Sequence, residues 1–457
     1  MSINYEERLQ KRISFLGLLA MSIGINIGGS LFALSSVAAG ITGPSLPFAM
    51  LLSSLPILLA IVPYGILASA WPTTSATYRY AQLVNPTLAF VCMLSLAICI
   101  VIGGQPLFAL AFGIYLKDIV PLDPIVVGIL VLTFFYVINL LGIDLTAKVQ
   151  IVLFFMLILA LLLYVILGVP NINANNLSNF FPHGVGGVFA AAGLLFTFCA
   201  GGLFVIDLGG EIIKAHRTLP RVLFIGILIA LIFYVGIHFV TIGVIEWTEL
   251  KGRSLIAVAE TFMSKPVLVY FIIGGALVAC ATSINTIFSV VSRGLMVVSG
   301  EGLLPKFIGR VNARYGTPHW GLTIAYGICV ISLIVIPSLL FFGSMLNLGL
   351  IFAITVVASS GLVIHKQYPM LYRESSIKVS PLILKSISFA IVIINSLIFI
   401  FFSIALQKGG KTRGASLLFL GVVVLVYIYA LTRRRIFRSI KESTRRGEFT
   451  YEMAQKE

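Results

Sequence analysis

The chain has 457 residues, of which 59% are hydrophobic and only 10% are charged, and its mean hydropathy is +1.08. A soluble domain carries about 25% charged residues, so this composition excludes an ordinary water-soluble enzyme or binding domain. The net charge of +15 would by itself suggest that the protein binds nucleic acid. However, apolar stretches near the ~20 residues that cross a bilayer recur along the whole chain. We therefore expect an all-α, multi-pass membrane protein that binds no nucleic acid.

Twelve apolar runs are predicted to cross the membrane, and the connectors between them leave no room for a separate soluble domain. Residues 1–457 are therefore read as a single membrane transport domain. In chain order the runs are 14–37, 46–70, 87–115, 124–142, 149–169, 188–208, 220–245, 267–297, 320–338, 345–365, 386–407 and 414–432. Met1–Arg12 is polar and leads straight into the first run, so no cleavable signal peptide is predicted and the N-terminus is expected to remain.

The basic residues predict the orientation. With an even number of spans both termini share one side, and most of the 31 Lys and Arg residues fall there. The opposite side holds only Lys117, Lys251, Arg253, Lys265, Lys408, Lys411 and Arg413. Because cytoplasmic loops carry the excess of Lys and Arg, both termini are predicted in the cytoplasm, with the protein in the plasma membrane. The basic tail 433–457 is predicted to face anionic lipid.

Two of the runs are interrupted by glycine pairs. The first reads SIGINIGGSLFAL from Ser22 to Leu34, and the sixth reads FTFCAGGLFVIDLGGE from Phe196 to Glu211. In both, Gly-Gly is followed by Leu-Phe. Five spans separate the two starts, so 1–169 and 188–365 are predicted as structural repeats, followed by helices 11 and 12 in 386–432. An odd number of spans per repeat inverts the second copy in the membrane, which gives a 5+5 inverted repeat.

A glycine break within the membrane has chemical consequences. A backbone group left unpaired in hydrocarbon costs several kcal/mol, so a broken helix needs a polar partner at the break. The N-terminus of the outer half-helix suits a carboxylate, and the free carbonyls of the inner half suit an ammonium group or Na⁺. The alternative is that these glycines only allow two helices to pack closely. The matched pair of breaks favours a transporter site.

Several motifs resemble the amino acid–polyamine–organocation (APC) superfamily, whose members have the LeuT-type fold. The segment GINIGGSLF is similar to that family's G-x-x-x-G-[ST]-G-I-F, with Gly29 and Ser30 in swapped order. The segment CAGGLFVIDLGGEIIKAHRTLPR resembles the family's motif in span 6. Fainter echoes are YRYA, SRGLMVVSGEGLLPK and QYPMLYR. Together these segments extend over spans 1–10.

The resemblance implies alternating access, in which spans 1, 2, 6 and 7 rock against spans 3, 4, 5, 8, 9 and 10. It assigns the substrate's α-carboxylate to Gly28, Gly29 and Ser30. It assigns the α-ammonium group to carbonyls near Asn26, Thr197 and Ala200. The sequence departs from the family after Gly201: the aromatic residue that lids the substrate is Gly202 here, and the following acid is Leu203. This departure predicts an open side-chain pocket, or a lid supplied by another residue.

Span 8 contains ALVACATSINTIF, which is similar to the Ala-x-x-Thr-Ser segment of sodium-coupled LeuT-fold proteins. The resemblance implies a Na⁺ site formed by Ala279, Thr282 and Ser283, completed by the carbonyls of Gly24 and Ile27. In proton-coupled relatives a lysine of span 5 takes this place, and here that position is about Leu157. The alternative is that the two hydroxyls bond back to carbonyls one turn earlier on their own helix.

Two acids follow the second glycine pair. Asp207 lies inside an apolar run, where carboxylates are expensive and usually functional. It is expected either to serve proton coupling or a cationic substrate, or to pair with an inner basic residue. Glu211 is expected to form a structural or gating ion pair with Arg217 or Arg221.

No nucleotide-binding loop, metal cluster or nucleophile–base set is found in the sequence, so we expect neither an enzyme nor a cofactor beyond Na⁺ as coupling ion. The first hypothesis is a sodium-coupled symporter of a neutral α-amino acid. The second is a proton-coupled permease or exchanger of cationic amino acids or polyamines, and the third is a non-transporting amino-acid sensor. The expected partners are an amino acid and the lipid bilayer, and the oligomeric state stays open.

Overall fold

The computed structural model describes all residues except 1–8, 10, 118, 251–252, 408–409 and 447–457. In this part of the chain β pairing is limited to two isolated bridges, Ile13 with Ile212 and Thr74 with Leu208. The rest of the regular structure is helical. The α-helices are α1 (Phe15–Asn26), α2 (Gly29–Thr42), α3 (Leu46–Ala70), α4 (Ala76–Gln82), α5 (Pro86–Cys99), α6 (Gln105–Lys117), α7 (Pro124–Leu140), α8 (Ile143–Gly168), α9 (Gly184–Ala200), α10 (Ala215–Val244), α11 (Leu255–Ala259), α12 (Lys265–Tyr270), α13 (Val278–Gly300), α14 (His319–Val335), α15 (Leu339–Ala358), α16 (Ser360–Gln367), α17 (Pro369–Glu374), α18 (Pro381–Gln407), α19 (Gly410–Thr432) and α20 (Arg434–Arg446).

The membrane-crossing elements agree with the predicted apolar runs. Ten helical segments of the described chain are long and apolar enough to cross a bilayer. Two further apolar helices, α7 and α14, have 17 residues each, which is at the lower limit of about 17 for a span. The prediction of an all-helical membrane protein is confirmed. The count of twelve spans and the inverted relation of the two repeats remain predictions.

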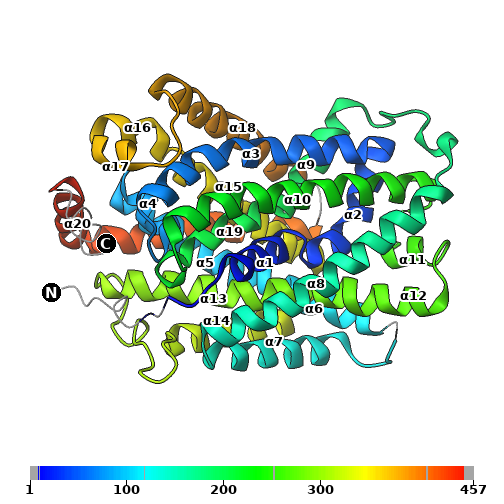
Figure 1. The fold of residues 1–457 in the computed structure, drawn as a ribbon, viewed down its shortest axis with the longest axis horizontal. Helices are drawn as coiled ribbons and strands as arrows, with labels where there is room; N and C mark the ends of the chain where they lie inside the picture. Colours follow the sequence, from blue (N-terminus) through cyan, green and yellow to red (C-terminus); the bar gives the residue numbers. More distant parts are fainter. Residues whose placement is uncertain (1–8, 10, 118, 251–252, 408–409, 447–457) are drawn as a thin grey trace.

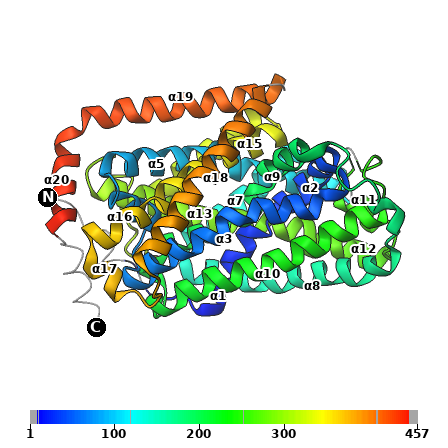
Figure 2. The same cartoon turned by 90° about the horizontal axis from the view of Figure 1, so that it is seen from above.

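The long helices run side by side along one axis of the molecule. Helices α16, α17 and α20 lie at one end of this bundle, and α11 and α12 lie at the other (Figure 1). Helix α19 follows one edge of the bundle, and α20 turns across its end (Figure 2). The segment after α15, with helices α16 and α17, therefore lies at the same end as the basic tail. The predicted topology likewise places both on one side of the membrane.

Local sequence sets where the spans begin. Asn85 Oδ1 accepts a hydrogen bond from the Thr87 backbone N–H at 2.9 Å, and Asp123 Oδ1 accepts one from the Ile125 N–H at 2.9 Å. Each of these caps is followed by a proline at the first helical position, where a missing N–H costs nothing. Two spans change to π-helical winding, at Ile100–Gly104 and at Phe271–Leu277, a feature that is frequent at functional sites.

The basic tail forms helix α20 as far as Arg446, and residues 447–457 of that predicted segment lie outside the described part. Phe437 is buried against the Phe90 ring of α5, with ring centroids 5.6 Å apart. The cations Arg434, Arg435 and Arg438 are exposed. In the predicted polar N-terminal segment, residues 1–8 and 10 also lie outside the described part.

Candidate functional site

The first interruption lies where the glycine pair predicts it. Helix α1 ends at Asn26, and the Ile27 N–H closes it by donating to the Ile23 carbonyl at 2.7 Å. Gly28 is extended, with φ −68° and ψ −173°, and α2 begins at Gly29 without a side-chain cap. The span is thus broken cleanly, and a helix N-terminus lies within the run of apolar residues.

The second interruption has a different form. Helix α9 ends at Ala200 and passes directly into a 3₁₀ helix over Gly201–Asp207, followed by another over Gly209–Glu211. Helix α10 begins only at Ala215. Span 6 therefore changes its winding at the glycine pair instead of opening a gap.

The two interruptions are in direct contact. A Cβ atom on Gly201 would lie 2.2 Å from Ile25 Cγ2, and one on Gly202 would lie 2.3 Å from Asn26 Nδ2. The Gly202 N–H donates to Asn26 Oδ1 at 2.6 Å. The Asn26 side chain thus fills the place where the resemblance implies an aromatic lid, so glycine is needed at position 202 for this close approach.

Tyr234 of α10 joins both interrupted spans. Its hydroxyl contacts the Asn26 carbonyl, the last of α1, and donates to the Phe198 carbonyl near the end of α9 at 2.8 Å. A phenolic hydroxyl has one hydrogen to donate, so it satisfies one of the two carbonyls at a time. Sequence reasoning missed Tyr234, although a tyrosine inside an apolar run is a signal that its hydroxyl needs a partner.

The start of α2 packs against span 8 and span 3. A Cβ on Gly28 would lie 1.9 Å from Ser283 Oγ, and one on Gly29 would lie 2.5 Å from Cys280 Sγ and 3.1 Å from Phe108 Cδ1. Ser30, the third residue assigned to the carboxylate, is buried here, as is Leu203 in span 6. The predicted substrate residues of spans 1 and 6 therefore lie together in the interior.

The predicted cation ligands also come together. Thr282 Oγ1 lies 3.1 Å from the Gly24 carbonyl and 2.8 Å from the Ala279 carbonyl. Ser283 Oγ lies 3.2 Å from each of the same two carbonyls. Within the described chain no hydrogen bond joins the Ile27 carbonyl to this group. Each hydroxyl can therefore donate either to the Ala279 carbonyl of its own helix α13 or to the Gly24 carbonyl of span 1.

A polar residue of span 5, Gln150, lies beside this group. A Cβ on Gly24 would lie 2.2 Å from Gln150 Nε2. Gln150 donates to the Ala20 carbonyl at 3.2 Å and accepts from Asn285 Nδ2 at 2.9 Å. Leu157 lies seven residues along α8, about two turns away. The alignment of Leu157 with the lysine of proton-coupled relatives therefore stays a prediction.

Asp207 is fully buried and is held by the N-terminus of α4. Its Oδ1 accepts from the Thr77 backbone N–H at 2.6 Å, and its Oδ2 accepts from the Thr77 hydroxyl at 2.9 Å. Among the described residues it forms no ion pair with a basic side chain. The carboxylate therefore caps a short helix of the span 2–3 connection.

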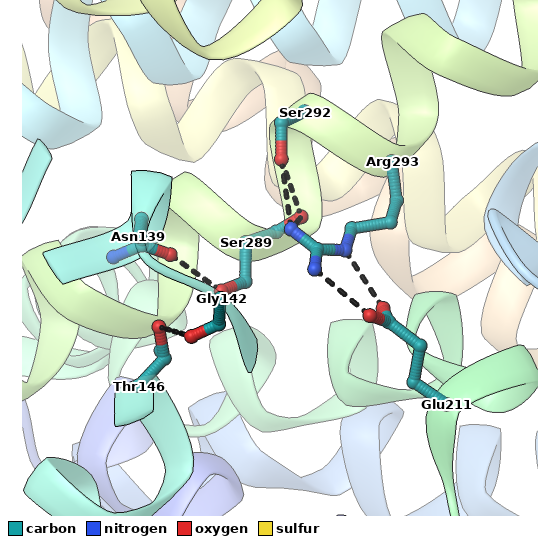
Figure 3. Close-up of polar contacts among 7 residues, drawn as sticks. All are labelled: Asn139, Gly142, Thr146, Glu211, Ser289, Ser292 and Arg293. Carbon is teal, nitrogen blue, oxygen red and sulfur yellow. Dashed lines mark hydrogen bonds and ion pairs between the residues drawn. The ribbon is translucent and has the colours of Figure 1, made fainter. Parts of the chain in front are cut away.

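Glu211 pairs with Arg293 of α13, and not with Arg217 or Arg221 as expected. Arg293 Nε and Nη2 donate to the two Glu211 carboxylate oxygens at 2.8 and 2.9 Å, and both side chains are 1% exposed (Figure 3). The expectation failed because it considered only nearby residues of the same connector. The Glu211 carbonyl also accepts from the N–H groups of Arg12 and Ile13, both at 2.9 Å.

These features define a multi-pass helical membrane protein with two interrupted helices in contact, an arrangement found in secondary transporters. An amino acid permease family model matches residues 13–428, and the chain belongs to this family.

Among its relatives, the chain is 24% identical over 394 residues to the cationic amino acid transporter 3, mitochondrial, of Arabidopsis thaliana, covering 80% of this chain and 64% of that protein. It is 24% identical over 392 residues to the branched-chain amino acid permease BcaP of Bacillus subtilis, covering 80% and 84%. It is 25% identical over 356 residues to the aspartate-proton symporter of the same bacterium, covering 72% and 68%. The chain spans only 61% to 64% of the length of the three plant cationic transporters that it matches.

Proposed function

We propose that the protein is a secondary active transporter of a neutral α-amino acid, driven by Na⁺ and working by alternating access in the plasma membrane with both termini in the cytoplasm. The observation that carries this proposal is the contact between the two interrupted spans. Asn26 and Gly202 touch at the points where the two apolar runs are interrupted. Interrupted helices survive in a membrane where a cavity or ligand satisfies their ends.

The two interruptions offer complementary chemistry to an amino acid. Helix α2 starts at Gly29 with no side-chain cap, so its first N–H groups and dipole suit the α-carboxylate. The carbonyls of Asn26 and Phe198 share one donor, the Tyr234 hydroxyl. A substrate ammonium group brings three donors and would satisfy both carbonyls at once.

The oxygen cluster of Gly24, Ala279, Thr282 and Ser283 supports Na⁺ as the coupling ion. Hard monovalent cations favour neutral hydroxyl and carbonyl ligands, and these four come from spans 1 and 8. Binding a cation there would therefore link the rocking span 1 to the scaffold span 8. Each Na⁺ that enters down the membrane potential supplies about 2.3 kcal/mol per 100 mV.

Contacts of Glu211 near the N-terminal start of span 1 support alternating access. The buried pair of Glu211 and Arg293 joins the end of the second interruption to α13. The backbone bonds from Arg12 and Ile13 to Glu211 tie the entry of span 1 to the same point. These contacts would have to open for release of substrate to the cytoplasm.

A second candidate, a proton-coupled carrier of cationic amino acids, is suggested by the names of the plant relatives. Asp207 would be its acid. Because both carboxylate oxygens are engaged by Thr77, the sodium-coupled function is the one that the geometry favours.

The test is uptake of labelled neutral and cationic amino acids into liposomes that contain the purified chain, under a Na⁺ gradient, a pH gradient or neither. We expect Na⁺-dependent uptake of a neutral amino acid that falls at least tenfold in Thr282→Ala. Thr286→Ala is the matched control, because within the described chain this buried hydroxyl one turn further on bonds only back to the Thr282 carbonyl. Uptake that ignores Na⁺ and is unchanged in Thr282→Ala would overturn sodium coupling. Uptake of cationic amino acids alone would overturn the neutral substrate.

A further inference from the structure

Three of the buried polar atoms that lack a hydrogen-bond partner within the described chain lie on helices in or around the interrupted spans. They are Gln105 Oε1 of α6, Thr197 Oγ1 of α9 and Asn347 Oδ1 of α15. Their residues are 1%, 4% and 0% exposed, respectively. Buried polar atoms are nearly always paired, so each such exception needs an explanation. In an apolar interior the simplest one is a polar partner that the chain itself does not supply.

Asn347 of α15 lies beside α9. Its Nδ2 donates to the Leu194 carbonyl of α9 at 3.3 Å. One turn earlier on α15, a Cβ on Gly343 would lie 3.5 Å from Leu34 of α2. Helix α15 runs towards α16 at one end of the bundle, whereas α2 runs towards the other end (Figure 1). The step from Gly343 to Asn347 therefore leads along α2 in the direction of Ser30 and the first interruption.

Thr197 lies on the same side of α9 as the carbonyl that Asn347 contacts. It follows Leu194 by three residues, which places the two one turn apart on one helix face. It also precedes Ala200, the last residue of α9, by three residues. Thr197 is thus one turn from the second interruption and one turn from the Asn347 contact.

Gln105 lies on a third helix, α6 of span 3. Its Nε2 donates to the Ile284 carbonyl of α13 at 3.3 Å, which fixes the amide and leaves Oε1 without a partner. Phe108, one turn further on α6, is the residue that packs against Gly29. Gln105 is also the first residue after the π-helical stretch Ile100–Gly104, and such stretches frequently mark functional positions.

We infer that Gln105, Thr197 and Asn347 form the side-chain part of the substrate site and select a neutral amino acid whose side chain donates a hydrogen bond, as a hydroxyl or carboxamide does. Two amide oxygens accept only, and the hydroxyl can accept as well. None of the three carries a charge to attract a cationic side chain. An aliphatic side chain would leave the acceptors unpaired, and a site built to hydrogen-bond its substrate strongly rejects an analogue that lacks the donor.

This inference rests on the proposed transport function, and isosteric substrate pairs test it. Threonine and valine have the same shape but differ in the hydroxyl, and asparagine and leucine differ in the amide in the same way. In competition with labelled substrate on the reconstituted full chain, we expect threonine to inhibit at concentrations at least tenfold lower than valine, or asparagine lower than leucine. In Asn347→Leu the preference should fall to within about twofold of unity, since the acceptor is lost.

Asn395→Leu is the matched control for this change. Asn395 is an equally buried asparagine without a partner within the described chain, but it lies on α18, which carries none of the three inferred residues and neither interrupted span. We expect it to keep the preference of the parent chain. If Asn347→Leu fails to give a monodisperse protein, Thr197→Val removes an acceptor with little change in volume and should lower the same preference.

The outcomes separate the two levels of the proposal. If no amino acid is taken up under any gradient, the proposed transport function is wrong. If uptake occurs but valine and leucine compete as well as threonine and asparagine, the transport function stands and this inference is wrong. A preference that persists undiminished in both Asn347→Leu and Thr197→Val would also overturn the assignment of these residues.

Discussion

The two interrupted spans both contain a Gly-Gly pair followed shortly by Leu-Phe, but they differ in structure. In the first, two residues leave the helix and a new α-helix starts at Gly29. In the second, the chain continues without a gap into 3₁₀ winding from Gly201 to Asp207. The first thus presents a helix N-terminus, which suits an anion, and the second mainly presents backbone to its neighbour. The difference teaches that the two halves of the site are not equivalent, although their sequences are alike.

The largest effect is expected where the second interruption is fixed to the scaffold. Arg293→Met leaves the buried Glu211 carboxylate without its cation, and breaking a buried ion pair costs about 3 to 5 kcal/mol. We expect a marked fall in the unfolding temperature measured in detergent. Asp144→Asn breaks the exposed pair with Lys148, whose side chains are 41% and 71% exposed, and should change stability by less than about 1 kcal/mol. Equal effects of the two substitutions would contradict the assignment of Glu211 as an anchor.

The contact between the interruptions can be broken from the side of span 6. Gly202→Ala places a methyl group 2.3 Å from Asn26 Nδ2, and the resulting overpacking is expected to cost about 1 to 3 kcal/mol. Uptake should fall as well. Gly327→Ala is the control, because nothing lies within 4 Å of its Cβ position on α14, and alanine there should be neutral or slightly stabilising. A Gly202→Ala chain as stable and active as Gly327→Ala would show that close packing at position 202 is not required.

Tyr234→Phe removes the hydroxyl that contacts the Asn26 carbonyl of span 1 and the Phe198 carbonyl of span 6. The loss of its hydrogen bonds is expected to cost about 1 to 3 kcal/mol, because buried carbonyls lose a donor. Its uptake should be impaired more than that of Tyr164→Phe. In the control, the buried Tyr164 hydroxyl lies 2.9 Å from Thr241 Oγ1, which also bonds to the Ile237 carbonyl. Uptake kinetics and thermal unfolding of both variants check this, and identical behaviour would rule out a special part for Tyr234.

The smallest effect is expected at the end of the 3₁₀ run. Asparagine caps helices about as well as aspartate, so Asp207→Asn should change stability by less than about 1 kcal/mol. Its uptake should keep the pH dependence of the parent chain, measured between mildly acidic and neutral pH. If Asp207→Asn abolishes a pH-driven component of uptake, the proton-coupled alternative gains and Asp207 is more than a cap.

Much of the fold follows from the sequence, because a bilayer admits few ways to pair backbone groups. The apolar runs predict the spans, and Gly28 predicts the first interruption because a break requires a residue that allows close approach. Thr282 and Ser283 lie beside the Gly24 carbonyl, as the resemblance implies, and the Na⁺ site itself stays a prediction. By contrast, Arg293 lies 82 residues from Glu211, and Gln150 lies 135 residues from Asn285.

Such pairings depend on the rotation of each helix about its axis. Most of these buried helices are apolar on all sides, so their sequence shows no polar face from which the rotation could be read. Helix α13 is the exception, because Thr282, Thr286, Ser289 and Arg293 recur on one face of it at helical spacing. The partner of Asp207 was missed for another reason, since Thr77 reaches it through a backbone N–H that every residue type but proline has. For the partner of Glu211 the sequence offered a signal, because Arg293 is a basic residue within an apolar run and so needs a buried partner.

The pairing of Ile13 with the connector after span 6 has a practical consequence. The Ile213 N–H donates to the Ile13 carbonyl at 3.0 Å, while the Glu211 carbonyl holds the N–H groups of Arg12 and Ile13. The first residues of the chain are therefore attached to a part that the proposed alternating access would move. An affinity tag or fluorescent protein fused directly before them would add a load to that motion, whereas the same fusion after α20 would not. A small environment-sensitive dye near residue 12 would in turn report each opening of this end of the bundle.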